Sequence, residues 1–231
     1  MLFWWDPLYF LFAMPALLLG LYAQAKVQSA YNRWLRAPAR LTGLEAAQRL
    51  LQTAGLYGVR LEGTPGHLTD HYDPSSKVLR LSPSVAGVPS VASLAVAAHE
   101  IGHALQDAEG YWGLRARAAL VPAVNFGSWL GPILFLIGFL MQSPTLVWAG
   151  VLFFSAAALF ALVTLPVELD ASRRALALLE SSGLLWTPEE RAGAREVLRA
   201  AALTYVAALA QALSTLAYYA FLAMGMRRSE E

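Results

Sequence analysis

Four long stretches of the sequence contain no charged residue, and they constrain the fold more than any other feature. They cover residues 7–25, 118–141, 145–167 and 200–226. A helix needs about 20 mostly apolar residues to cross the hydrocarbon core of a bilayer. Only 14% of the chain is charged, whereas soluble domains carry about 25% charged residues. We therefore expect a mostly α-helical integral membrane protein with three or four transmembrane helices.

The spacing of these stretches predicts how the helices are connected. The second and third stretches are separated by Gln142, Ser143 and Pro144, so we expect an antiparallel helical hairpin. The first stretch lacks the basic segment that precedes a secretory signal, and we interpret it as an uncleaved signal-anchor. The fourth stretch is more polar, and it either crosses the bilayer or lies partly in the interface.

The positions of Lys and Arg predict the orientation, because such residues concentrate in cytoplasmic loops. If the first three stretches all cross, eight basic residues fall on one side: Lys26, Arg33, Arg36, Arg40, Arg115, Arg117, Arg173 and Arg174. We expect that side to be cytoplasmic and the protein to reside in the cell (plasma or inner) membrane. Arg227 and Arg228 conflict mildly with this topology if the fourth stretch crosses. The net charge of +1 and the scattered basic residues do not support a nucleic-acid partner.

The segment between the first two stretches is typical of a small α+β unit. Thr42 and Glu45 form a capping-box pattern, which predicts a helix start. Ser90 is a candidate cap for a second helix. Short strands are expected where turn residues bound apolar runs, at 58–62, 67–72 and 77–81.

These observations predict five segments along the chain. They are an N-terminal signal-anchor helix at 1–25, a cytoplasmic α+β unit at 26–117, a transmembrane hairpin at 118–167, cytoplasmic helices at 168–199, and a C-terminal hydrophobic helix and tail at 200–231.

The second predicted helix of the α+β unit carries the sequence "HEIGH". His99 and His103 are four residues apart, so on a helix both imidazoles face one side and can hold one Zn²⁺. Glu100 is placed to take a proton from a water molecule that attacks a peptide carbonyl. The alternative is a pair of histidines packed in a polar core. We expect one zinc ion per chain, bound at this motif.

A zinc site of this kind needs a third ligand. Glu168 is the leading candidate, because it opens a helix directly after the third charge-free stretch. Between His103 and Glu168 the chain would cross the bilayer twice and return to the same side. Asp170 is the main alternative, and His67 and His71 are further candidates.

Four motifs, "LTDHYDP", "AVAAHEIGHALQ", "PVELDASRRAL" and "AALTYVAALAQAL", resemble the YugP-type membrane zinc metallopeptidases over about residues 2–224. That family is similar in plan to the HtpX-type and CAAX-prenyl-protease-like gluzincins, in which a Glu on a later helix is the third zinc ligand. The resemblance implies His99, His103 and Glu168 as ligands and Glu100 as general base.

The sequence departs from the HtpX-type pattern at one position. That pattern has an Asp four residues after the ligand Glu, where it supports a zinc-binding His. Here the position is Ser172, so Ser172 and Asp170 are the candidates for this support.

A metallohydrolase also needs a hydrogen-bond donor for the oxyanion of its tetrahedral intermediate. The candidates are His71, Tyr72 and Arg173. In the simpler interpretation, "DHYDP" makes a hairpin turn and Arg173 is an anchor on the basic side of the membrane. By analogy with gluzincins, we expect the strand "KVLRL" to be an exposed edge on which a peptide substrate adds as a strand.

The function expected from the sequence is a zinc endopeptidase acting on membrane or membrane-proximal polypeptides at the cytoplasmic face, with membrane and misfolded proteins as candidate substrates. Its partners would be the lipid bilayer and a polypeptide substrate, and an oligomer or a further membrane partner is compatible with the sequence. The apolar run before His99 is too short to span with its motif, and no Asp lies in a charge-free stretch. We therefore expect the zinc at or just above the membrane surface. The alternative is a zinc-stabilised scaffold without catalysis.

Overall fold

The computed structural model describes residues 7–228, and the chain divides into two compact units. Residues 7–22, 115–165 and 205–228 form one unit, which we call the helical unit. Residues 23–114 and 166–204 form the other, which we call the α+β unit.

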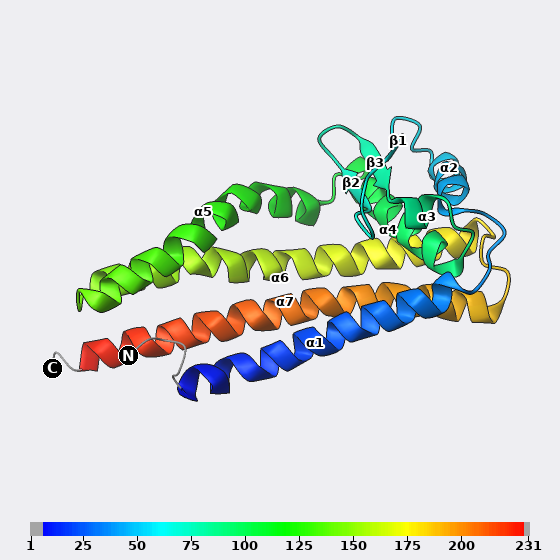
Figure 1. Ribbon diagram of the computed structural model, residues 1–231. Coiled ribbons are helices and arrows are strands. Elements are labelled where there is room, and N and C mark those ends of the chain that lie inside the picture. Colours follow the sequence, from blue (N-terminus) through cyan, green and yellow to red (C-terminus); the bar gives the residue numbers. More distant parts are fainter. Residues whose placement is uncertain (1–6, 229–231) are drawn as a thin grey trace. The chain divides into compact units, whose positions relative to one another are not determined.

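Four of the described helices are long and apolar enough to cross a membrane. They are α1 (Pro7–Leu35), α5 (Trp112–Leu140), α6 (Pro144–Ser181) and α7 (Pro188–Arg228) (Figure 1). Each contributes residues to both units. These four helices agree with the expectation of a mostly α-helical membrane protein with three or four transmembrane helices. At about 1.5 Å per residue, α6 is about 57 Å long, nearly twice the roughly 30 Å thickness of the hydrocarbon core.

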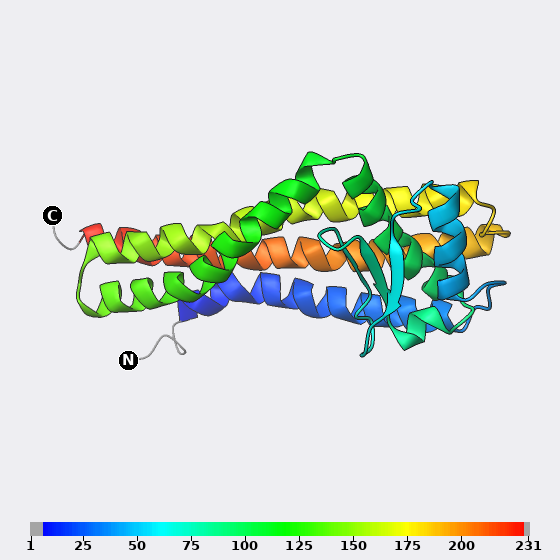
Figure 2. The same ribbon diagram turned by 90° about the horizontal axis from the view of Figure 1, so that it is seen from above.

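Within the helical unit, α5 and α6 form the antiparallel hairpin expected from the sequence (Figure 2). Glycines allow the two backbones to approach closely, since a Cβ atom at Gly150 would collide with the backbone nitrogen of Phe135. In the same unit, α1 packs against α7. The hydroxyl of Ser214 donates to the carbonyl of Phe12, and the ring of Tyr218 meets that of Tyr9 edge-on at 5.2 Å.

The α+β unit contains α2 (Gly43–Thr53), β1 (Arg60–Gly63), β2 (His71–Asp73), β3 (Val78–Leu81), α3 (Pro83–Ala86) and α4 (Val91–Ala108). The predicted helix starts are confirmed. Thr42 and Glu45 form both hydrogen bonds of the capping box, and the side chain of Ser90 accepts from the backbone of Ser93.

The described strands form one sheet in the order β1-β3-β2. β1 pairs parallel with β3 and β2 pairs antiparallel with it. The expectation that "KVLRL" is an exposed edge is therefore wrong, because β3 is the central strand and both of its sides are paired. Burial explains this position, since Val78, Leu79 and Leu81 all lie in the core. The edges of the sheet are β1 and β2.

Helix α4 lies at the centre of the α+β unit, beside the sheet (Figure 1). It contacts α2, α3, β2 and β3. Its first turns are packed against these elements, since Val91, Leu94 and Ala98 are at most 1% exposed. The apolar run before His99 is therefore a packed segment of the core of this unit.

Candidate metal centre

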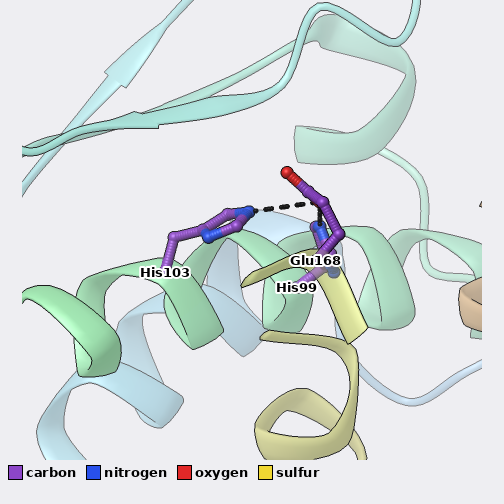
Figure 3. A group of neighbouring side chains, drawn as sticks. All are labelled: His99, His103 and Glu168. Carbon is purple, nitrogen blue, oxygen red and sulfur yellow. Dashed lines mark hydrogen bonds and ion pairs between the residues drawn. The ribbon is translucent and has the colours of Figure 1, made fainter. Parts of the chain in front are cut away.

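Three side chains converge where α4 meets α6 inside the α+β unit. His99 and His103 come from α4 and Glu168 from α6 (Figure 3). Their ligand atoms all lie within 4.8 Å of one another. Oε2 of Glu168 is 3.1 Å from Nε2 of His99 and 3.5 Å from Nε2 of His103. Both imidazoles thus present the same nitrogen to the same carboxylate, as the spacing of four residues predicts.

A glycine allows the two helices to come this close. Gly102 lies between the histidines, and a Cβ atom there would collide with the backbone carbonyl oxygen of Ala171 on α6. The direct contact between backbones brings Glu168 within reach of α4. The glycine of the motif is thus required for packing between helices, and this role is separate from the chemistry of the histidines.

A buried glutamine fixes the orientation of His103. The Nδ1 atom of His103 is 3.0 Å from Oε1 of Gln106. The amide nitrogen of Gln106 donates to the carbonyl of Val167 at 2.8 Å and to the carboxylate of Asp170 at 3.0 Å. Since both of these partners can only accept, the amide oxygen must face His103, and Nδ1 must carry the hydrogen. This leaves Nε2 directed at Glu168, as a metal ligand requires.

The orientation of His99 is supported by Ser172, whose hydroxyl lies 3.2 Å from Nδ1. Ser172 stands four residues after Glu168, one turn along α6. It occupies the position of the supporting Asp in the HtpX-type pattern and contacts a histidine of the cluster from there. Asp170, the other candidate for this support, contacts Gln106 and pairs with Arg173 and Arg174.

Gln106 is the functional candidate that the sequence reasoning missed. It lies three residues after His103, and residues three apart share a helix face. A polar side chain at this position of a buried helix was therefore a usable signal.

Burial shapes the acid–base properties of the residues on α4. It raises the pKa of Glu100, although the charges of His99 and His103 act in the opposite direction. For His103, burial alone would lower the pKa, but the hydrogen bond to Glu168 and the charge of Glu100 outweigh it and raise the pKa. Two carboxylates and two imidazoles thus share a site with little access to water.

Glu100 is held by the sheet. The backbone N–H of Tyr72, in the edge strand β2, donates to Oε2 of Glu100 at 3.0 Å. The hydroxyl of Tyr72 donates to Asp107 at 2.6 Å, and Asp107 also pairs with Lys77. Burial and the neighbouring Asp107 raise the pKa of Tyr72, so its hydroxyl keeps its proton.

The remaining candidates make their contacts outside the three-residue cluster. The exposed ring of His71 contacts the carbonyl of Thr69 at 2.9 Å and the guanidinium of Arg80 at 3.4 Å. Arg173 is 79% exposed and pairs with Asp170. The ring of His67 lies against Tyr31. A role of His71 or Arg173 in oxyanion stabilisation stays a prediction.

The donor set suits zinc. Two imidazole nitrogens and one carboxylate oxygen are the three protein ligands typical of a catalytic zinc site, which keeps a further position open for water. The tautomer imposed on His103 by Gln106 is the one such a site requires. The cluster therefore has the composition, the burial and the supporting hydrogen bonds of a zinc centre.

Comparison with known proteins agrees with this chemistry. A family model described as "Putative neutral zinc metallopeptidase" matches residues 9–224. The chain belongs to this family. The chain is also 46% identical over 203 residues to the "Putative membrane protease YugP" of Bacillus subtilis (strain 168), an alignment that covers 87% of this chain and 90% of the relative. No solved structure matches. The chain is thus a homologue of a membrane protease, within a zinc metallopeptidase family, and it carries a His/His/Glu group able to hold a metal.

Proposed function

We propose that the chain is a membrane-integral zinc endopeptidase of the HExxH gluzincin type, acting on membrane or membrane-proximal polypeptides at the cytoplasmic face. One observation carries the proposal. The ligand atoms of His99, His103 and Glu168 lie within 4.8 Å of one another, and Glu100 lies buried beside the first of them on the same helix. One zinc ion per chain would be held by these three side chains.

The chemistry divides between the metal and Glu100. A bound zinc ion would polarise the substrate carbonyl and lower the pKa of a water to about 7. Glu100 accepts the proton of the attacking water and passes it to the leaving amine. The N–H of Tyr72 holds Oε2 of Glu100, which leaves Oε1 for this transfer. Burial raises the pKa of Glu100, which makes its carboxylate a stronger base toward the proton of the water.

The substrate is expected to bind along β2 instead of β3. β2 is an edge strand, and its pairing with β3 uses one side only. The N–H of Tyr72 that reaches Glu100 lies on the other side. A peptide that adds to this side as a strand would place its carbonyl groups beside Glu100. His71 lies in the same strand and Arg173 lies five residues after Glu168, so both are retained as proposed oxyanion donors.

The cytoplasmic orientation can be tested separately. Glu168 follows directly after the charge-free stretch 145–167, so the site would lie near the surface where the basic residues gather. The chain has no Cys, and single cysteines can be introduced at Gln142 and at Ser182. In intact cells, a membrane-impermeant thiol reagent should label Gln142→Cys and spare Ser182→Cys. The reverse pattern would invert the proposed topology.

The catalytic proposal is tested with Glu100→Gln. The purified variant should keep about one zinc per chain and lose proteolysis by about 100-fold or more, the range of a general base. Glu189→Gln, at an exposed acid at the start of α7, is the matched control and should keep full activity. Unchanged proteolysis in Glu100→Gln would refute the mechanism. A wide screen of unfolded and membrane substrates without metal-dependent cleavage would favour the zinc-stabilised scaffold instead.

A further inference from the structure

A groove with several cationic side chains runs between α1 and α7 within the α+β unit. It has a volume of about 450 Å³. Lys26 from α1 and Arg195 and Arg199 from α7 line it. None of these residues takes part in the proposed chemistry of the metal centre, so the groove needs a separate explanation.

The groove lies where both helices change from apolar to polar sequence. Lys26 is the first charged residue after the charge-free stretch 7–25, and Arg199 is the last before the stretch 200–226. Beside these cations, Ala30, Ala200 and Leu203 give the groove an apolar part. In membrane helices, this transition from apolar to charged residues marks the level of the lipid headgroups.

The charge of the groove is positive. Among its described lining residues, Glu196 is the acid, and it is already engaged. It accepts a hydrogen bond from the indole nitrogen of Trp34 at 2.8 Å and pairs with Arg33 at 3.5 Å. The guanidinium of Arg199 forms no ion pair with a described residue and is therefore available to an external anion.

A neighbouring groove of about 230 Å³ extends the cationic surface. Arg195 and Arg199 line it too, and Arg173 of α6 joins them. Arg195 also pairs with Glu180 at 3.8 Å and Arg173 with Asp170, so Arg199 is the arginine of this surface without an ion pair to a described residue. Guanidinium groups bind phosphate through paired N–H donors, which favours arginine at phosphate sites. Basic pockets between membrane helices are typical sites for anionic headgroups.

We propose that the groove lined by Lys26, Arg195 and Arg199 binds the phosphate of an anionic phospholipid. The cations would contact the phosphate diester, and the apolar residues would contact the glycerol and the first carbons of an acyl chain. A headgroup with a net negative charge fits this lining, whereas the trimethylammonium of a zwitterionic lipid would add a cation to a positive groove. The proposal does not depend on zinc or on proteolysis.

The test measures lipid retention by the full chain in detergent, using native mass spectrometry with phosphatidylglycerol and phosphatidylcholine in equal amounts. The wild-type protein should retain phosphatidylglycerol in preference to phosphatidylcholine. The double variant Lys26→Gln/Arg199→Gln should bind phosphatidylglycerol about tenfold or more weakly, the loss expected for two basic contacts at a membrane surface. An unchanged helical circular dichroism spectrum and zinc content would show that this variant remains folded.

The matched control removes the same charge elsewhere. Arg36 and Arg191 are exposed and do not line the groove, so Arg36→Gln/Arg191→Gln should retain phosphatidylglycerol as the wild type does. An equal loss in both double variants would mean general attraction and overturn the site. Equal retention of both lipids would also overturn it. Inorganic phosphate at the same concentration should not displace the lipid; displacement would assign the groove to free phosphate.

Discussion

The two units of the molecule expose and bury opposite kinds of side chain. Among the described residues, 25 of the 30 exposed large hydrophobic side chains lie in the helical unit. Eight of the nine buried polar or charged side chains lie in the α+β unit. An apolar surface of this extent is unsuited to water and indicates contact with lipid. The α+β unit instead has an interior in which polar groups are concentrated.

This difference points to the α+β unit as the place of the candidate metal centre. Five of its buried polar residues surround one point, the contact of α4 with α6: Glu100, His103, Gln106, Glu168 and Asp170. Buried charges are unfavourable unless they are paired and hydrogen-bonded, and each of these side chains has such a partner. Such a cluster is understandable as a metal centre, and the helical unit has no counterpart among its described residues.

The largest effect is expected from removing the proposed third ligand, Glu168. This change would disrupt the polar cluster that distinguishes the interior of the α+β unit from that of the helical unit. Glu168→Ala should weaken zinc binding by more than about 100-fold, beyond the loss seen when a residue behind a ligand is removed. Asp170→Ala, two residues along the same helix, should retain zinc. Zinc per chain in the purified variants measures this directly. The opposite result would make Asp170 the ligand.

A smaller loss is expected from Gln106→Leu, which keeps the volume and removes the support of His103. Without the amide, Nδ1 of His103 loses its acceptor and the ring can rotate. We expect zinc affinity to fall by about 10–100-fold, as for other partners behind metal ligands. Competition with a zinc-binding dye would give the affinity. Gln48→Leu, at an exposed position of α2, is the control, and equal affinities in the two variants would show that Gln106 has no such role.

Substitutions at two glycines, one in each unit, test how tightly the helices pack around them. Gly102→Ala places a methyl group against the backbone of Ala171, and overpacking of this kind costs about 1–3 kcal/mol. Gly20→Ala in α1 meets nothing within 4 Å and should leave stability unchanged or slightly higher. Thermal unfolding in detergent should show a lower midpoint for Gly102→Ala only. Equal midpoints would mean that the contact of α4 with α6 tolerates a side chain.

The smallest effect is expected from Ser172→Ala. The hydroxyl makes one partly buried hydrogen bond to His99, and such a bond contributes about 1 kcal/mol. Zinc affinity should therefore fall by only about fivefold in the same competition assay. A loss as large as that of Gln106→Leu would show that the two histidines are supported equally.

Local patterns in the sequence predicted the elements well. The capping box at Thr42 and the cap at Ser90 depend on neighbouring residues, so they can be recognised without the fold. The grouping of His99, His103 and Glu168 was predictable because helical spacing joins the first two, and the hairpin returns the chain to the same side for the third.

Contacts between distant segments were not predictable in this way. The sequence "KVLRL" of β3 does not show that β1 pairs with one of its sides. This pairing is parallel, and β2 lies between the two strands in the chain. The partnership of Gln106 with Val167 and Asp170 depends on how α4 and α6 approach each other. That approach is governed by Gly102. A glycine there indicates close packing of another element against the helix, but the sequence does not show that this element is α6.

The zinc coordination sphere is the most direct test of the central claim. X-ray absorption spectroscopy at the zinc edge, on the purified full chain, reports the type and number of ligand atoms. We predict one zinc per chain with two imidazole nitrogens and carboxylate or water oxygens at about 2.0–2.2 Å. A sphere without two imidazoles, or a protein that binds no zinc, would contradict the assignment of His99, His103 and Glu168.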